Sequence, residues 1–175
     1  MLPVFERDYE FARDFTLTPE TLNHDRVILR CDGLDTLCDL TLNGVHLGHC
    51  DNMHRTWRFE VKDFLHPGEN RLEIRFQSAS AYVKAHPSQV GKPFSVIRKA
   101  ACMFGWDWGL NLPDMGIWRD IYLESFDHAR IEHVQVDQKH SPDGVTLTVQ
   151  AEAEVWGDVR LSVQVAESLP TYLTD

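Results

Sequence analysis

Apolar and polar residues alternate along much of this chain. The alternation is clearest in four stretches, at residues 55–61, 71–76, 145–155 and 159–165. A period of two places the apolar side chains on one face of a half-buried β-strand. Helical patterns are short by comparison, since only residues 18–22 and 78–86 suit a helix, and neither makes three turns. The pattern therefore predicts an all-β sandwich.

One stretch predicts a β-hairpin. Asn43-Gly44 suits a two-residue type I′ turn, in which both residues take a positive φ. With that turn Leu42 lies opposite Val45, and Leu40 lies opposite Leu47. Both pairs are apolar and lie on one face, so the turn and the hydrophobic pattern agree. A second turn signal, at residues 66–70, joins two of the alternating strands.

The strands divide into two series. Residues 116–126 read as the closing strand of the first series, and a new series begins at Ala129. We therefore predict one domain at residues 1–128 and a second at residues 129–175. The second is too short for a complete immunoglobulin-like sandwich of about 100 residues. Its last strand would leave an unpaired edge, so we expect self-association through the strands beyond Ala129.

Charge and composition exclude some classes of binding partner. The formal net charge is -10, which repels phosphate backbones, so we expect no nucleic-acid partner. No apolar run reaches the ~18 residues of a membrane span, so we expect no membrane partner. The N-terminus lacks the features of a signal peptide, which favours a cytoplasmic location. The four cysteines match no zinc or redox spacing, and a disulfide between Cys31 and Cys38 requires that the fold bring them close.

The most informative segment is "FGWDWGLNLPDMGIWR", residues 104–119. Glycines and a proline break it, so it is not one regular element. Trp106, Asp107 and Trp108 combine two indoles with a carboxylate. An indole packs on the C–H face of a sugar ring, and a carboxylate accepts hydrogen bonds from its hydroxyls. This chemistry favours carbohydrate binding, with Arg98 and Lys99 orienting the carboxylate or keeping it ionised.

A structural interpretation of the same segment stays open. In it Trp106 and Trp108 fill the sandwich core, and Asp107 pairs with Arg98. We interpret Trp118, in the closing strand, as a packing residue with Arg119 beside it.

Other polar clusters suggest less chemistry. His46, His49, Cys50 and His54 follow no zinc pattern, and on a regular hairpin arm His46 and His49 point to opposite faces, so we expect no metal and no cofactor. Glu152 and Glu154 lie two apart on a predicted strand, which is typical of a solvated face.

The stretches "RKAACMFGWDWG" and "LPDMGIWRDIYLES" together resemble the N-terminal domain of family 2 glycoside hydrolases, most closely the β-mannosidases. The resemblance implies a galactose-binding-like jelly roll, then an immunoglobulin-like domain, then a (β/α)₈ barrel with two catalytic carboxylates. It implies an exo-acting retaining enzyme that removes terminal β-linked mannose. Trp106, Asp107 and Trp108 would then be substrate-binding residues, and Asp107 would bind hydroxyls of the terminal sugar.

The chain departs from the family pattern at Leu110, where a proline often follows the second glycine. It also offers no carboxylate pair for a retaining mechanism, so we expect no catalytic residues and no activity from this chain alone. Three alternatives stay open: a stand-alone carbohydrate-binding module, a sister enzyme such as an exo-glucosaminidase or β-galactosidase, and a purely structural domain.

Overall fold

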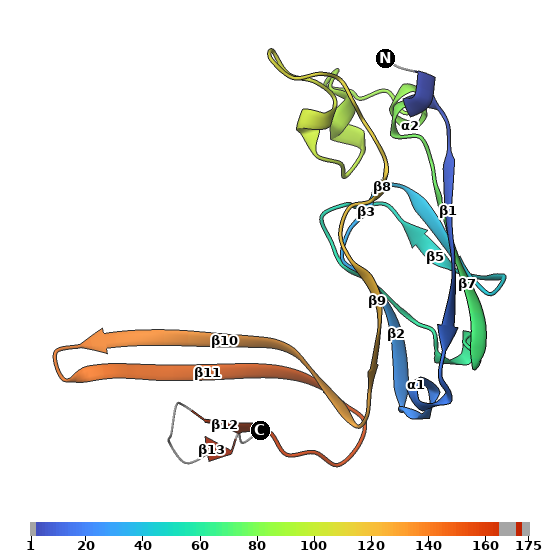
Figure 1. Cartoon of the computed structure of the whole chain (residues 1–175). Coiled ribbons are helices and arrows are strands. Elements are labelled where there is room, and N and C mark those ends of the chain that lie inside the picture. The colour runs from blue at the N-terminus through green and yellow to red at the C-terminus, as the bar shows by residue number, and fades with distance from the viewer. Residues whose placement is uncertain (1–2, 165–170, 173–175) are drawn as a thin grey trace. The chain divides into compact units, whose positions relative to one another are not determined.

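The computed structural model describes residues 3–164 and 171–172. The chain forms two compact units, residues 1–125 and residues 126–175. Both units consist mainly of β-strands (Figure 1). The predicted all-β class is therefore confirmed.

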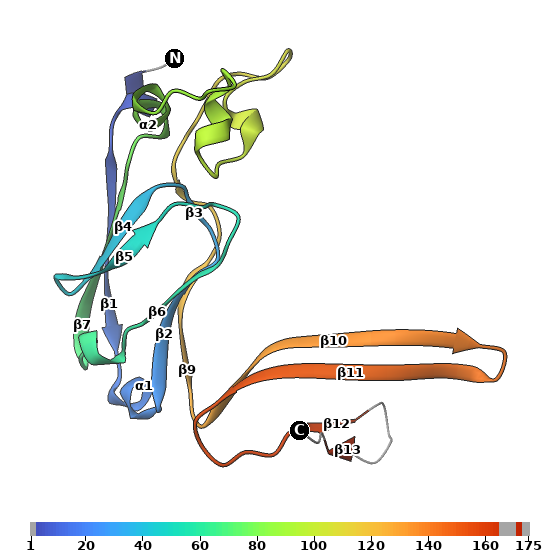
Figure 2. The same cartoon turned by 180° about the vertical axis from the view of Figure 1, so that it is seen from behind.

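Unit 1 contains two main sheets (Figures 1 and 2). The four-stranded sheet has the order β1 (Tyr9–Leu17), β7 (Gly68–Phe76), β4 (Cys38–Leu42), β5 (Val45–Cys50). The three-stranded sheet has the order β6 (Trp57–Glu60), β2 (Arg26–Cys31), β9 (Ile121–Phe126). A short ladder joins β3 (Leu34–Asp35) to β8 (Gly116–Ile117).

The core lies between these two sheets. Leu40 and Phe76 come from the four-stranded sheet, and Val27, Leu29 and Cys31 come from β2 of the other. All five are buried, with Phe76, Leu40, Val27 and Cys31 at 0% exposure. The alternating residues thus turn their apolar side chains inward, and burying each large side chain contributes roughly 1.5–3 kcal/mol. Unit 1 is the predicted sandwich.

The predicted hairpin turn is confirmed, and the predicted register is partly wrong. Asn43 and Gly44 have φ of 50° and 81°, as a type I′ turn requires. Leu42 pairs with Val45 as predicted, whereas Leu40 pairs with Gly48. The register shifts between Leu40 and Thr41, because one extra residue of β5 bulges out of the ladder.

The short helices lie where the sequence places them. They are α1 (Pro19–Asn23) and α2 (Ala79–Ala85), and the side chain of Ser78 caps α2 by accepting a hydrogen bond from the Ala81 amide. Four 3₁₀ turns complete the unit: η1 (Pro3–Glu6), η2 (Lys62–Phe64), η3 (Pro93–Val96) and η4 (Ala101–Met103). The segment 61–67 between β6 and β7 links strands of different sheets.

The predicted closing strand at 116–126 is interrupted. It consists of β8 and β9, with Trp118, Arg119 and Asp120 between them outside both ladders. This interruption places the three side chains at the surface of unit 1, where all three are exposed.

Unit 2 contains a long ribbon. Strands β10 (Ala129–Ser141) and β11 (Gly144–Val155) pair antiparallel, with a register shift between Ile131 and His133. Two short strands, β12 (Ser162–Val163) and β13 (Thr171–Tyr172), form a separate ladder. Only Ser162–Val163 of the predicted strand at 159–165 is a strand, and residue 165 lies outside the described residues. That residues 129–175 begin an immunoglobulin-like sandwich stays a prediction.

Candidate functional site

The Trp-Asp-Trp segment forms the tip of a closed loop of unit 1. The amide of Trp106 donates to the carbonyl of Gly109 at 3.2 Å, and the amide of Gly109 donates back to Trp106 at 3.1 Å. Further from the tip, the Leu112 amide donates to the Met103 carbonyl at 3.0 Å. Gly105 has a φ of +93°, which favours glycine at the point where the chain enters the tip.

The tip presents its side chains to solvent. Trp106 is 58% exposed and Trp108 is 86% exposed, and their rings meet edge to face with centroids 5.9 Å apart. Asp107 is also exposed, and its carboxylate makes no hydrogen bond or ion pair with any residue in the described part of the chain. The structural interpretation, with both indoles in the core and Asp107 paired with Arg98, is therefore wrong.

The basic residues before the loop do not orient Asp107. Lys99 is buried, and its ammonium donates to Asp35 Oδ2 at 2.5 Å and to the Asp114 carbonyl at 2.6 Å. Arg98 is exposed and contacts Met53 through its backbone carbonyl. The expectation that either residue holds the Asp107 carboxylate is wrong, because Lys99 points into the protein and binds two other oxygens.

Trp118 packs on one side only. Its Nε1 donates to the Met53 carbonyl at 3.2 Å, and a Cβ placed on Gly33 would lie 2.5 Å from that nitrogen. The residue is nevertheless 44% exposed, and the Arg119 guanidinium stacks over its ring at 4.1 Å from the centroid. The predicted packing role is confirmed for the face against Gly33.

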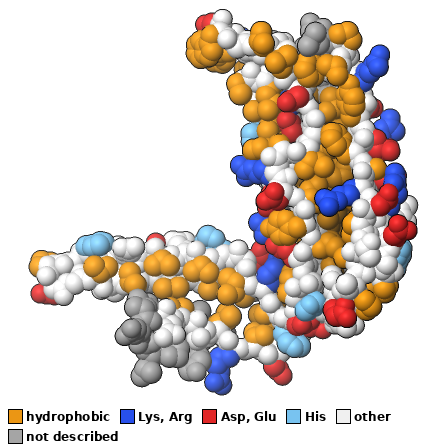
Figure 3. Space-filling model, viewed as in Figure 1, with side chains coloured by type: hydrophobic (Ala, Val, Ile, Leu, Met, Phe, Trp, Pro, Cys, Tyr) orange, Lys and Arg blue, Asp and Glu red, His pale blue; other side chains and the backbone are white. Residues whose placement is uncertain are grey.

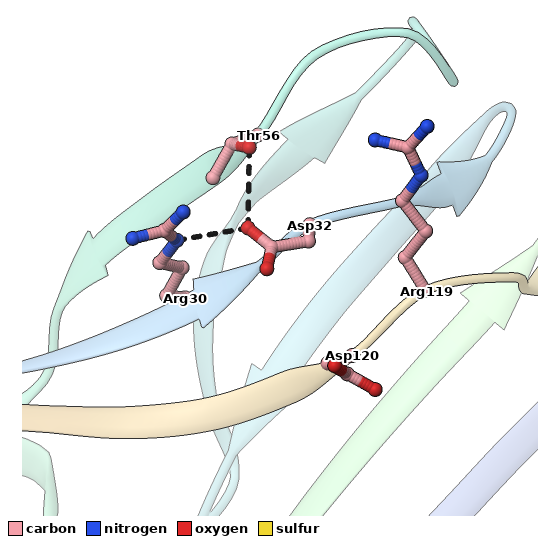
Figure 4. A pocket seen from close by; sticks show the side chains of 5 residues that line it. All are labelled: Arg30, Asp32, Thr56, Arg119 and Asp120. Carbon is pink, nitrogen blue, oxygen red and sulfur yellow. Dashed lines mark hydrogen bonds and ion pairs between the residues drawn. The ribbon is translucent and has the colours of Figure 1, made fainter.

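A polar cleft of about 420 Å³ lies beside Arg119 (Figure 4). Asp32 receives hydrogen bonds on one carboxylate oxygen from Arg30 Nε at 2.8 Å and from Thr56 Oγ1 at 3.2 Å. The hydrogen bond from Arg30 holds the pKa of Asp32 below its usual value. Asp120 completes the lining. The cleft could not be predicted from the sequence, because its residues come from the end of β2 and from three separate segments outside the strands, which only the fold brings together.

A second hollow of unit 1 is apolar. It is a groove of about 790 Å³ where β1 and β9, the edge strands of the two sheets, leave the sandwich open. Phe11, Phe15 and Ile121 line it, and apolar side chains gather on this face with a basic side chain among them (Figure 3). Most of its lining continues the core, and the charged residues Arg119 and Asp120, which also line the polar cleft, lie in it as well.

The histidines of the hairpin share one carboxylate. His46 Nε2 and His49 Nδ1 each lie 3.2 Å from Asp39 Oδ1. The expectation that His46 and His49 point to opposite faces is wrong, because the bulge in β5 shifts the alternation between them. Burial acts to raise the pKa of Asp39, but the hydrogen bonds and electrostatic interactions with His46 and His49 together outweigh it, so the pKa is lowered. Among the described residues no three His, Cys, Asp or Glu side chains are grouped so as to hold a metal ion.

The four cysteines are free. Cys31, Cys38 and Cys50 are buried, and Cys102 is exposed near the loop. Burial raises the pKa of the Cys31 thiol to about 12, and a hydrogen bond with Cys38 together with burial raises that of Cys50. In the part of the chain that is described, no helix is long and apolar enough to cross a membrane.

Comparison with known proteins identifies this architecture. A family model described as "Glycosyl hydrolase 2 galactose-binding domain-like" matches residues 2–119. The two-sheet sandwich is therefore a galactose-binding-like domain. Because the match covers more than half of the chain, the chain belongs to this glycosyl hydrolase 2 family, and the resemblance seen in the sequence is confirmed.

Sequence relatives and solved structures similar to this chain are also glycosidases. A β-mannosidase of Rattus norvegicus is 29% identical over 162 residues, covering 83% of this chain and 18% of the relative. The crystal structure of a β-D-mannosidase from Dictyoglomus thermophilum superposes with a TM-score of 0.82 at 32% identity, covering 87% of this chain and 20% of that one. An exo-chitosanase of Amycolatopsis orientalis shares the fold, with a TM-score of 0.66 at 19% identity over 97% of this chain and 19% of that one. The chain thus spans about a fifth of the length of such relatives.

Proposed function

We propose that this chain is the sugar-recognising N-terminal part of a β-mannosidase-like retaining exo-glycosidase, which hydrolyses terminal, non-reducing β-linked mannose. The likeness to two β-mannosidases supports the substrate class. The observation that carries the proposal is the exposed Asp107 carboxylate, which follows one exposed tryptophan and precedes another and has no protein partner among the described residues. A solvent-facing tip of this composition has no core to stabilise, so its chemistry is directed outward.

The tip supplies both halves of sugar recognition. The indoles of Trp106 and Trp108 offer apolar faces to the C–H groups of a pyranose ring. Asp107 accepts hydrogen bonds from hydroxyls of the terminal sugar, and a charge-assisted bond of this kind contributes about 1.5–3 kcal/mol when water is excluded. Asp107 also closes the end of the pocket beyond the terminal sugar, which restricts the enzyme to exo cleavage.

The catalytic carboxylates belong to another part of the longer polypeptide. A retaining mechanism needs an acid/base and a nucleophile about 5 Å apart across the scissile bond. Glu152 and Glu154 are exposed on β11, and Glu154 pairs with Arg130 at 3.4 Å. They have the surroundings of a solvated strand face, so we expect this chain alone to release no sugar.

The test is Asp107→Asn in the longer enzyme, with Asp143→Asn as the matched control. Asp143 is another exposed turn aspartate, far along the chain in the β10–β11 turn. We expect kcat/KM for an aryl β-mannoside to fall 10- to 100-fold in Asp107→Asn, which is about 1.4–2.7 kcal/mol, with the control unchanged. Unchanged kinetics of Asp107→Asn would exclude a role in the sugar pocket.

Two further measurements separate the alternatives. A panel of aryl glycosides distinguishes a mannosidase from an exo-glucosaminidase or a β-galactosidase, and we expect the mannoside to be the best substrate. Calorimetric titration of mannose into this chain alone tests the stand-alone module. We expect weak or no binding, because one loop provides only one wall of a pocket, whereas micromolar binding would favour an independent carbohydrate-binding module.

We also propose that this chain on its own associates with a second copy through the β10–β11 ribbon. One face of the ribbon carries four apolar residues, each between 41% and 53% exposed: Val134, Val136, Val145 and Leu147. Apolar side chains line the ribbon in Figure 3. Light scattering should show a dimer at micromolar concentration, and a monomer at every concentration would refute the proposal.

A further inference from the structure

Lys99 is the most completely buried charged side chain described for unit 1, with 0% of the side chain exposed. Its Nζ lies 2.5 Å from Asp35 Oδ2 and 2.6 Å from the Asp114 carbonyl oxygen, and 3.6 Å from Asp114 Oδ1. Asp35 is also buried, at 5% side-chain exposure. An ammonium inside a protein is stable only when such oxygens replace its water.

The three residues occupy special places in the chain. Lys99 precedes the loop that carries the Trp-Asp-Trp tip, and Asp114 ends it. Asp35 lies in β3, whose partner strand β8 begins at Gly116, directly after the loop. The Lys99 ammonium therefore joins the outgoing arm, the returning arm and the sandwich at one point.

The returning arm has few other attachments: the Leu112 amide bonds to the Met103 carbonyl of the outgoing arm, and one residue of the arm is buried. Residues 106–112 are all exposed, and only Pro113 of that arm is buried before Asp114. The outgoing arm has a separate attachment, because Phe104 packs against the buried residues Leu37 and Ile97. The position of the tip relative to the sandwich thus depends on a few attachments. On the returning side they are the buried Pro113 and the contacts of Lys99 with Asp114.

We propose that Lys99 is a positioning residue for sugar recognition: it fixes the base of the loop so that Asp107 and the two indoles face the sugar pocket. This inference rests on the proposed function of the tip. Lys99 itself touches no sugar, since its ammonium is enclosed. By holding the tip in place before a sugar binds, Lys99 reduces the conformational entropy that the tip loses on binding.

The variant that tests this must avoid stranding a buried charge. Lys99→Met alone leaves the Asp35 carboxylate buried without a counter-charge and is expected to destabilise the fold. The double variant Lys99→Met/Asp35→Asn removes both charges and keeps an amide oxygen that accepts from Thr36 Oγ1, as Asp35 does. The matched control is Lys84→Met, which breaks the exposed ion pair with Glu6.

The first measurement is hydrogen exchange on this chain. In the double variant we expect the amides of Trp106 and Gly109 to exchange at least tenfold faster, while the amide of Ile74 in β7 and all amides of Lys84→Met keep their rates. Faster exchange confined to the loop supports the tether. Unchanged exchange at Trp106 and Gly109 would overturn the proposal, because the tip would then be held without Lys99.

The second measurement is made on the longer enzyme. Loss of positioning should raise KM for an aryl β-mannoside about tenfold with kcat within threefold, because binding is weakened before and at the transition state alike. If Asp107→Asn lowers kcat/KM but the double variant changes neither constant, Lys99 does not position the tip and the proposal fails. If Asp107→Asn has no effect, the proposed function fails, and the exchange experiment still decides whether Lys99 tethers the loop.

Discussion

Replacing Asn43 with glycine tests how much of the sandwich depends on one turn side chain. Asn43 Nδ2 donates to the Phe64 carbonyl at 2.8 Å and to Asn70 Oδ1 at 2.8 Å, and its Oδ1 accepts from the Arg71 amide at 2.8 Å. Asn43 thereby joins the β4–β5 turn to the entry of β7. Glycine adopts the same positive φ, so Asn43→Gly keeps the turn and removes only these contacts.

The expected cost follows from those three bonds. Each contributes about 1 kcal/mol net, and glycine adds roughly 0.5–1 kcal/mol of unfolded-state entropy. Because the side chain is half-buried, water restores part of the loss, so we expect Asn43→Gly to lower the free energy of unfolding by about 2–4 kcal/mol. A residue that only formed the turn would change it by less than about 1 kcal/mol.

Urea unfolding followed by tryptophan fluorescence measures this cost, because four of the five tryptophans lie in unit 1. Asn43→Asp is the internal control, since it keeps the acceptor for Arg71 and loses both donated bonds. Its stability should fall between wild type and Asn43→Gly. A loss below 1 kcal/mol in Asn43→Gly with an unchanged m-value would refute the reasoning.

Three further outcomes are expected. Phe76→Ala, in the centre of the core at 0% exposure, should cost about 3–5 kcal/mol in the same urea assay. The hydrogen bond from Arg30 lowers the pKa of Asp32 in the folded state, so the Asp32 carboxylate takes up a proton more readily in the unfolded chain. The stabilisation from this bond is present above about pH 4 and is lost as the pH falls through the folded-state pKa. Asp32→Asn should therefore flatten the acid limb of the stability profile, and an unchanged limb would contradict it. Iodoacetamide at pH 7 should label Cys102 alone in the native chain and all four cysteines in urea, and mass spectrometry can count the labels. The reason is that burial keeps thiols such as Cys31 protonated and out of reach of the reagent.

The sandwich could be predicted from the sequence because its strands have one buried face. Along such strands apolar and polar residues alternate with a period of two, and the Asn43-Gly44 turn has steric requirements that few residues meet. The register beyond the turn could not be predicted, since the bulge in β5, opposite Leu40 and Thr41, depends on packing of the sheet. Gly48, beside the bulge, takes a φ of 157°. A Cβ placed on it would lie only 3.0 Å from the ring of Phe59 in β6, a strand distant in the sequence.

The composition of the candidate site could be predicted, and its surroundings could not. The two tryptophans and the aspartate at positions 106 to 108 are residue types that suit carbohydrate binding. The position of Lys99 could not be inferred, because its partners Asp35 and Asp114 are 64 and 15 residues away in the chain. Sequence proximity suggested Asp107 as the partner. Only the fold shows that the Lys99 ammonium is buried and bonds to oxygens of Asp35 and Asp114 instead.

The enclosed ion pair of Lys99 with Asp35 has a consequence for how this family can diverge. A homologue that replaces the lysine with an uncharged residue retains a carboxylate sealed from water unless position 35 changes as well. The two positions should therefore co-vary across homologues, passing together between a charged and a neutral pair. Lineages with a neutral pair should also carry some other brace at the return of the tryptophan loop, such as a longer apolar contact near position 113.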